Sequence, residues 1–399
     1  MSHTPHPSGR VREVFGAFLL LGLTSFGGPI AHLSYFRTEF VERRRWLSEQ
    51  AYADLVALCQ FLPGPASSQV GFALGLMRGG AWGAAAAWTA FTLPSAIVLV
   101  LFALGTAVLE GPVSQGIIHG LKVTAVAIVA HAVWGMARSL CPDSRRAGIA
   151  LAAVFTVVLV SGPLGQVAAI MIGALAGMVL CRTQDATQAH TLSLPVSARV
   201  GHLAALAFVL LLVGLPLLAW ASPSATLAVM DAFYRAGALV FGGGHVLLPL
   251  LEAEVVQSGW VTPDDFLAGY GAAQAVPGPL FTFAAYLGAV MGPLGGSLLG
   301  AALALVMIFL PGLLLLVAVL PHWNRFRRWV GAQALMRGAN AAVVGILGAA
   351  LYHPVFTSAI LGPHEFALAL TGFLLLSVWK LPAWAVVIIL AAGGIVITL

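Results

Sequence analysis

Charged residues are scarce in this chain. Asp, Glu, Lys and Arg make up only 8% of its 399 residues, whereas 60% of the residues are hydrophobic. A water-soluble domain of this size needs far more charge on its surface, so the composition excludes that class. Successive apolar runs near membrane-spanning length predict an all-α polytopic membrane protein, whose surroundings are a lipid bilayer.

Several kinds of chemistry are missing as well. The cysteines Cys59, Cys141 and Cys181 lack CxxC spacing, so we expect three small buried hydrophobes. No metal-ligand cluster, nucleophile–base pair or phosphate-binding loop stands out, and we therefore expect no metal, no cofactor and no enzyme activity. The chain lacks a Walker A motif, so we do not expect it to hydrolyse ATP itself. Any transport would then be driven by an ion gradient or by a partner ATPase, or would need no energy source. The net charge of +5 does not indicate nucleic-acid binding, because the arginines cluster in loops, where they set membrane orientation.

One pair of motifs occurs twice, and we call its members the FGG and PGP motifs. The first copy is Phe26-Gly27-Gly28 followed by Gln60-Phe61-Leu62-Pro63-Gly64-Pro65, and the second is Phe241-Gly242-Gly243 followed by Gln274-Ala275-Val276-Pro277-Gly278-Pro279. Gly and Pro interrupt helices, and lipid offers no partners to the backbone groups that an interruption frees. Matched interruptions in each half of a membrane protein indicate a solute pathway, as in secondary transporters.

The repeat extends beyond the two motifs. Its matched pairs are Gln60 with Gln274, Leu93-Pro94 with Leu310-Pro311, and Gly120 with Gly338, at separations of 214, 217 and 218 residues. Small loop insertions account for the drift in separation. We expect an N-terminal transporter repeat with two extra helices over 1–181, a polar linker over 182–200, and a C-terminal transporter repeat with flanking helices over 201–399.

Loop charges give each copy a direction. The loop after the first FGG motif carries Arg37, Arg43, Arg44 and Arg45. The matching loop of the second copy carries Glu252, Glu254, Asp264 and Asp265, without Lys or Arg. Because cytoplasmic loops are rich in Lys and Arg, the two copies are expected to enter the membrane in opposite directions, as inverted-topology repeats. A duplicated structural domain is the alternative, and the opposed charges disfavour it.

The same rule predicts that one apolar segment of the first copy does not cross the membrane. The arginine loop should lie inside, and the loop at 110–116, with Glu110, should lie outside. Two apolar segments separate these loops, and two full crossings would return the chain to the same side, so one of the segments should not cross. Arg78 follows the PGP segment, which favours a re-entrant hairpin with its bend at Pro63-Gly64-Pro65. The FGG segment, with Arg12 before it and Arg37 after it, can fold in the same way. Arg235 fits this scheme poorly, because its segment should begin outside.

The PGP motif of the first copy is suited to binding an anion. Pro65 is favourable at the first position of a new helix, and a helix N-terminus attracts anions through its free amides and its dipole. Ser67 and Ser68 add hydroxyl donors in the first turn of that helix. In the second copy Leu280 and Phe281 replace this serine pair, so we expect the first copy to be the more polar one.

Other polar and small residues complete the candidate site, each with a structural alternative. The FGG glycines can let the backbone approach an ion or allow tight helix packing. Gln60 and Gln274 suit a polar pathway or a helix–helix hydrogen bond. Lys122 is a functional candidate because a buried lysine is costly, although it can also snorkel to the interface. The candidate substrate-binding residues are Ser25, Phe26, Gly27, Gly28, Gln60, Pro63, Gly64, Pro65, Ser67, Ser68, Lys122, Phe241, Gly242, Gly243, Gln274, Pro277, Gly278 and Pro279.

These motifs resemble those of the chromate ion transporter family in its long, two-domain form. The stretches that carry the resemblance are Leu23–Pro29, Leu58–Gln69, Val240–His245 and Gln274–Pro279. The resemblance implies a secondary transporter that exports chromate, a tetrahedral oxyanion, across the bacterial inner membrane, driven by a gradient, and that confers chromate resistance. A sulfate-type anion permease and a gated anion channel are the alternatives. A proton or another ion is the expected coupling partner, and a homodimer stays open.

Reporter fusions test the opposed directions of the two copies. A reporter placed after Arg45 and one placed after Asp265 should lie on opposite sides of the membrane, because the loops that hold them carry opposite charge. Paired alkaline phosphatase and green fluorescent protein fusions measure the side directly. Finding both positions on one side would refute the inverted repeat.

Overall fold

The computed structural model describes residues 7–106, 111–182, 196–294, 296–323 and 329–399. Residues 1–6, Glu110 and most of the predicted linker, 183–195, lie outside these described residues. All regular elements within the described ranges are helices, and no strand occurs among them. The all-α class predicted from composition is therefore confirmed.

Six helices are long and apolar enough to cross a membrane by length and composition. They span Ala66–Gly105, Pro112–Leu140, Pro163–Leu180, Ala198–Ala221, Leu298–His322 and Val330–Ala359. This agrees with the predicted polytopic class. The inverted direction of the two copies in a bilayer stays a prediction.

The first half of the chain contains short helices before long ones. Its elements are α1 (Pro7–Thr24), α2 (Gly28–Arg37), η1 (Thr38–Arg43), α3 (Glu49–Phe61), α4 (Ala66–Thr106), α5 (Pro112–Leu140), α6 (Ser144–Leu159) and α7 (Pro163–Leu180). The helices α1 and α3 end directly before the FGG and PGP motifs. The helices α2 and α4 begin directly after or within them.

The second half repeats this order after an additional helix, α8 (Ala198–Ala221). Around its motifs lie α9 (Ala225–Ala238), η2 (Gly244–Val246), α10 (Leu247–Leu251), η3 (Glu252–Val256), α11 (Pro263–Ala273), η4 (Leu280–Thr282), α12 (Phe283–Val290) and η5 (Gly292–Leu294). The chain then forms α13 (Leu298–Val319), η6 (Leu320–His322), α15 (Val330–Ala350), η7 (Leu351–Phe356), α16 (Thr357–Ala359), α17 (Pro363–Ser377) and α18 (Ala383–Thr398). The helices are interrupted at the motifs here too.

The chain reverses direction at each FGG motif. Phe18 on α1 and Phe36 on α2 have ring centroids 5.5 Å apart, although they lie on either side of Gly27 in sequence. In the second copy, Arg235 on α9 donates to Glu254 on η3 at 2.8 Å across the same kind of bend. The two arms of each FGG hairpin therefore lie side by side.

The PGP motifs are bends of the same kind. The Arg78 guanidinium lies 5.3 Å from the ring centroid of Trp46, which precedes α3, so the chain returns to the start of this arm. In the second copy, the Tyr286 hydroxyl on α12 donates to the carbonyl oxygen of Asp265 at the start of α11, at 3.0 Å. The predicted helix breaks at both motifs are thus present as hairpins.

The long element α4 is itself two helices. Gly79 and Gly80 leave helical geometry inside it, and Gly80 has a φ of +63°, which glycine adopts without the strain of a side chain. A Cβ on Gly75 would clash with the carbonyl oxygen of Gly83, so the two arms pack backbone against backbone. In the second half, the turn between α12 and α13 occupies the equivalent place.

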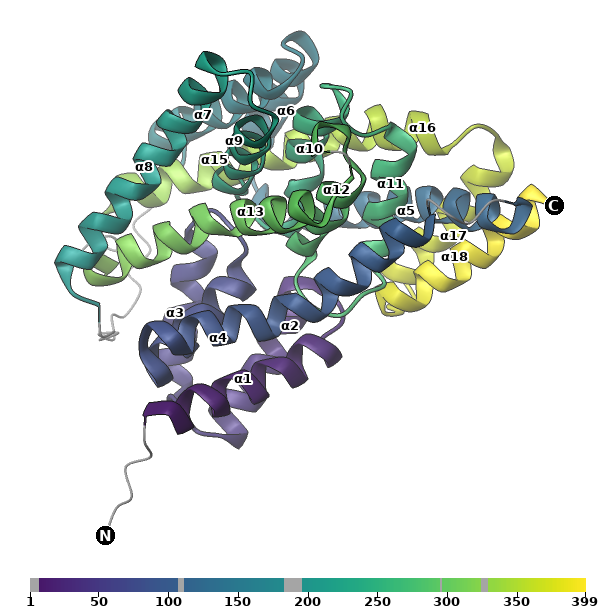
Figure 1. The fold of residues 1–399 in the computed structure, drawn as a ribbon. Helices are drawn as coiled ribbons and strands as arrows, with labels where there is room; N and C mark the ends of the chain where they lie inside the picture. Colours follow the sequence, from purple (N-terminus) through teal and green to yellow (C-terminus); the bar gives the residue numbers. More distant parts are fainter. Residues whose placement is uncertain (1–6, 107–110, 183–195, 295, 324–328) are drawn as a thin grey trace.

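The extra helices of each half pack on the other half (Figure 1). The helices α17 and α18 lie against α5, and α6 and α7 lie against α15. A Cβ on Gly120 of α5 would clash with the carbonyl oxygen of Leu390 on α18. A Cβ on Gly338 of α15 would clash with the carbonyl oxygen of Gly173 on α7. The matched glycines of the two copies therefore each accommodate a helix from the opposite half.

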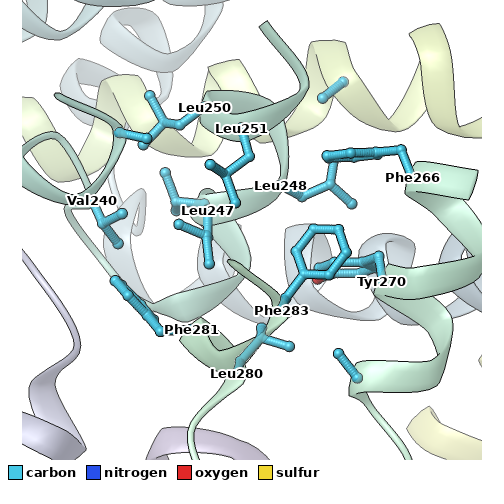
Figure 2. Close-up of a cluster of buried hydrophobic side chains, with 14 of the residues drawn as sticks. Val240, Leu247, Leu248, Leu250, Leu251, Phe266, Tyr270, Leu280, Phe281 and Phe283 are labelled. Carbon is cyan, nitrogen blue, oxygen red and sulfur yellow. The ribbon is translucent and has the colours of Figure 1, made fainter. Parts of the chain in front are cut away.

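The buried core is continuous around the second pair of hairpins (Figure 2). Its side chains come from α10, α11 and the arm after the second PGP motif, and include Leu247, Leu248, Leu251, Phe266, Tyr270, Leu280, Phe281 and Phe283. The outer helices, in contrast, expose apolar side chains such as Leu159 and Trp220, which are 80% and 88% exposed. Such exposure is expected where lipid tails, rather than water, surround a helix.

The crossing of α5 and α18 should depend on Gly120. We expect Gly120→Val to lower the free energy of unfolding by about 1–3 kcal/mol, because its side chain must push apart two backbones that already touch. Gly135→Val on the same helix is the control, since a Cβ there has open space, and should change stability by less than about 0.5 kcal/mol. Denaturation of the detergent-solubilised protein, followed by circular dichroism, measures both. Equal effects would contradict the crossing.

Candidate functional site

The bends of the two halves are hydrogen-bonded to each other. The backbone N–H of Gly64 in the first PGP motif donates to the carbonyl oxygen of Val240, just before the second FGG motif, at 2.7 Å. The backbone N–H of Gly278 in the second PGP motif donates to the carbonyl oxygen of Ser25, just before the first FGG motif, at 2.9 Å. The four motifs therefore meet in one place. We call it the central junction and define it as residues 25–28, 63–65, 240–243 and 277–279.

Glycine is required at these bends by conformation as well as by space. Gly64 has a φ of +118° and Gly278 a φ of +104°, values that side-chain-bearing residues rarely adopt. A Cβ on Gly64 would lie 3.0 Å from the Cα of Gly312, and one on Gly278 would lie 2.8 Å from the Oγ of Ser95. Each PGP bend is thus seated against a long helix of the opposite half.

The long helices carry a proline where they receive these bends. Ser95 follows Pro94 in α4, and Gly312 follows Pro311 in α13. A proline inside a helix has no N–H to donate, so a carbonyl one turn earlier loses its helical partner. The matched Leu-Pro pairs of the sequence repeat therefore place weakened helix turns beside the central junction.

Polar groups gather on the first-half side of the junction. The His32 side chain is 1% exposed, and its Nε2 lies 3.1 Å from the carbonyl oxygen of Ser25. Its Nδ1 lies 3.3 Å from the Oγ of Ser67 in the first turn of α4. A carbonyl oxygen only accepts, so Nε2 carries the proton, and Nδ1 of the neutral ring accepts from the Ser67 hydroxyl. His32 thereby connects the FGG bend to the N-terminal end of α4.

Sequence reasoning did not select His32 as a site residue. Lone histidines in apolar segments are mostly structural, and no second histidine occupies the equivalent position of the other copy. The available signal was its place one turn after the first FGG motif. One partner, the Ser25 carbonyl, lies seven residues before His32, but the other, Ser67, lies 35 residues after it, so the sequence alone does not reveal that His32 connects them.

Several buried polar atoms around the junction have no hydrogen-bond partner within the described part of the chain. They are the Ser25 Oγ, Ser68 Oγ, Gln69 Oε1 and Thr92 Oγ1. Buried polar groups are nearly always paired, so unpaired ones in a cluster are candidates to bind a polar solute. Ser25 and Ser68 also follow from the sequence prediction, whereas Thr92 does not.

Gln69 fixes the first PGP bend in place. Its Nε2 donates to the carbonyl oxygen of Pro63 at 3.0 Å and to that of Gly312 at 2.9 Å, so one amide joins the bend to α13. At the equivalent position of the second copy stands Phe283, which is buried in the apolar core of Figure 2. The first-half side of the junction is therefore polar, and the second-half side is packed with apolar side chains.

The remaining predicted site residues lie in different surroundings. Phe26 is 6.2 Å from Trp384 of α18, measured between ring centroids. Gln60 is exposed on α3, whereas Gln274 is half-buried. Lys122 forms an ion pair with Asp264 at 2.6 Å, at the beginning of α11, while the second PGP motif follows the end of that helix. The structure thus does not bring the Lys122 ammonium to the central junction.

Comparison with protein families identifies the chain. A family model described as "Chromate transporter" matches two stretches, residues 12–178 and 227–397. The chain belongs to the chromate transporter family. The resemblance carried by the FGG and PGP motifs is therefore confirmed, and both pairs of motifs lie inside the matched stretches.

Similar members of the chromate transporter family span nearly the whole chain. The probable chromate transport protein of Synechococcus elongatus is 28% identical over 411 residues, which cover 98% of this chain and 96% of that protein. The chromate transport protein of Pseudomonas aeruginosa is 27% identical over 96% of this chain and 90% of its own length. That of Cupriavidus metallidurans is 26% identical over 94% and 90%. No solved structure matches the chain.

Family membership and the six apolar helices together establish a multi-pass membrane protein. In such a protein, backbone that is neither helix nor strand must be buried in protein or line a cavity. In the central junction of this chromate transporter family member, the N–H groups of Gly64 and Gly278 are paired with carbonyls of the opposite half, whereas Gly27 and Gly242 of the FGG motifs are exposed.

The bridging role of Gln69 can be measured. We expect Gln69→Met to lower the free energy of unfolding by about 1–3 kcal/mol, since it leaves the buried Gly312 carbonyl and the half-buried Pro63 carbonyl without their donor. The matched control is Gln115→Met on the exposed face of α5, which should be close to neutral. Denaturation of both variants in detergent compares them. If Gln69→Met is as stable as the control, the bridge does not support the junction.

Proposed function

We propose that this protein is a secondary transporter that exports chromate across the bacterial inner membrane, driven by an electrochemical gradient. The observation that supports it most is the central junction, where the broken helices of two halves meet through the reciprocal bonds of Gly64 and Gly278. Transporters commonly place their substrate site where discontinuous helices of two repeats meet. The names of the relatives indicate chromate as the solute.

The polar side of the junction suits a tetrahedral dianion. The N-terminal end of α4 presents amides and the positive end of the helix dipole, which attract anions. Ser68 and Ser25 hold hydroxyls that are buried and unpaired among the described residues, and Ser67 lies beside them. A dianion that leaves water needs several such donors at once. Chromate and sulfate share charge and shape, so both are candidates for this site and chromate is the one we favour.

The ends of the hairpins support an inverted arrangement of the two halves. In the first half, Glu13 pairs with Arg78 at 2.9 Å and with Arg44 at 3.8 Å, within a region rich in arginine. In the second half, Arg235 pairs with Glu254 at 2.8 Å, within a region rich in carboxylates. Because positive loops face the cytoplasm, we place the first-half hairpin ends inside and the second-half ends outside. The bends then meet within the membrane.

His32 is the group through which we expect a proton to influence the anion. In its neutral form the ring accepts the Ser67 hydroxyl proton. A second proton on the ring makes Nδ1 a donor, so the Ser67 hydroxyl can turn and donate elsewhere. Protonation thereby adds both a positive charge and a hydrogen-bond donor beside α4. Proton binding and oxyanion binding at the junction would then favour each other, so a proton would leave with the dianion, and the membrane potential, which is negative inside, would drive the net negative charge outward.

Flux into inside-out membrane vesicles tests substrate, direction and coupling together. We expect saturable, uphill uptake of chromate that requires an imposed membrane potential, positive inside the vesicle, with sulfate as a weaker substrate or competitor. Gly64→Leu should abolish this uptake, because its φ of +118° and its contact with Gly312 leave no room for a side chain. Gly105→Leu, at a position with open space, is the control and should retain it.

Each other outcome of this experiment contradicts a stated part of the proposal. Fast, downhill and non-saturable movement identifies a channel. Preference for sulfate identifies a sulfate-type permease. Uptake that persists in Gly64→Leu removes the central junction from the pathway, provided that the variant reaches the membrane in normal amount.

A further inference from the structure

A second positively charged site lies outside the central junction. It is a hollow of about 210 Å³ where the beginning of α6, the end of α7 and the middle of α15 come together. Arg145, Arg146 and Arg337 line it together with Asp143, so three guanidinium groups face one carboxylate. Nothing in the transport mechanism above uses these groups.

The arginines are held in position by the protein. Arg145 donates to the carbonyl oxygen of Leu180 at 3.2 Å, and Arg337 donates to that of Cys181 at 3.1 Å, both at the end of α7. Arg146 donates to Asp143 at 2.6 Å. A guanidinium has five N–H donors, so the bonds of Arg145 and Arg146 named here leave donors for a ligand.

Asp143 does not cancel this positive charge. It caps α6 by accepting from the backbone N–H of Arg146 at 2.9 Å. That N–H first, and then the Arg146 guanidinium, hold the pKa of Asp143 below its ordinary value, so the carboxylate is ionised at neutral pH. Among the described residues that line the hollow, three positive charges therefore stand against one negative charge.

An apolar groove adjoins the hollow. Its volume is about 320 Å³, and it runs between α6 and α7 past Gly148, Ala152 and Ala176. Arg145 and Leu180 line both the hollow and the groove. The outer faces of α6 and α7 expose Leu151, Leu175, Val179 and other apolar side chains, as expected of a surface in contact with lipid tails.

We infer that the hollow and the groove together bind one anionic phospholipid, with its phosphate on the three arginines and an acyl chain along the groove between α6 and α7. Basic pockets between helices on the cytoplasmic side are suited to anionic headgroups. A free oxyanion would use the hollow but not the apolar groove, and this decides for the lipid. The inference uses the membrane orientation proposed above, which places the arginine-rich helix ends inside.

The site also joins the two halves of the chain. Arg145 and Arg146 belong to the first half and Arg337 to the second, and α7 and α15 touch through Gly177 and Gly338. A phosphate bound to all three arginines would connect α6 and α7 of the first half to α15 of the second half. Anionic lipid should therefore stabilise the folded protein.

Thermal unfolding of the purified protein with defined lipids tests the site. Phosphatidylglycerol should raise the unfolding temperature, whereas phosphatidylcholine and inorganic phosphate at the same concentration should not. The double substitution Arg145→Gln and Arg146→Gln should weaken the apparent affinity for phosphatidylglycerol by about tenfold or more, because charge-assisted hydrogen bonds are lost. Arg199→Gln, at an exposed arginine at the start of α8, is the matched control.

A second variant tests the groove without touching the arginines. Gly148→Leu fills the groove at a position where a Cβ meets nothing within 4 Å, so the fold should tolerate it. It should reduce phosphatidylglycerol binding, whereas Gly214→Leu, which also points into open space on α8, should not. Stabilisation by phosphate alone, equal effects of both lipids, or unchanged binding in Gly148→Leu would each overturn the lipid site. Because binding is measured rather than flux, the result is independent of the transport proposal.

Discussion

A helix inside a membrane can be interrupted only where the protein itself pairs the backbone groups that the interruption frees. Here the two halves do this for each other: Gly64 donates to Val240, and Gly278 donates to Ser25. Neither half contains the carbonyl that accepts from the glycine N–H of its own PGP bend, so neither forms the junction alone. The rest of the architecture accommodates these reciprocal hydrogen bonds. The long helices α4 and α13 pass beside the PGP bends at Pro94 and Pro311, and the arms of the hairpins extend away from the junction.

The two copies divide the work of the junction unequally. In the first, hydroxyl, imidazole and amide groups surround the start of α4, and Gln69 joins the bend to α13. In the second, Leu280, Phe281 and Phe283 fill the equivalent space and pack into the core. The junction therefore has one polar side and one apolar, closely packed side. The two copies share the same bends and differ in the side chains that surround them.

Local chemistry made part of this arrangement predictable. Glycine and proline interrupt helices wherever they occur, so the breaks at Gly27, Gly64 and their counterparts could be read from the sequence, as could the polar difference between Ser67 and Phe281. The cross-pairing of FGG with PGP could not, because a backbone hydrogen bond between distant segments leaves no trace in residue type. The same holds for the contact of His32 with Ser67, 35 residues away, and for Lys122, whose long side chain can reach Asp264 instead of the junction. The charge of a loop predicts the direction in which a segment enters the membrane, but not which residues contact each other.

The helices α6 and α7 of the first half pack on α15 of the second half, and α17 and α18 pack on α5 of the first half. This packing has a consequence for biosynthesis. When α6 and α7 leave the ribosome, the surface of α15 against which they pack has not yet been made, and α5 similarly precedes α17 and α18. The close glycine surfaces at Gly120 and Gly173 must therefore spend part of translation facing lipid or a membrane chaperone. The helices of the first half therefore complete their packing only after the helices of the second half have been synthesised and inserted.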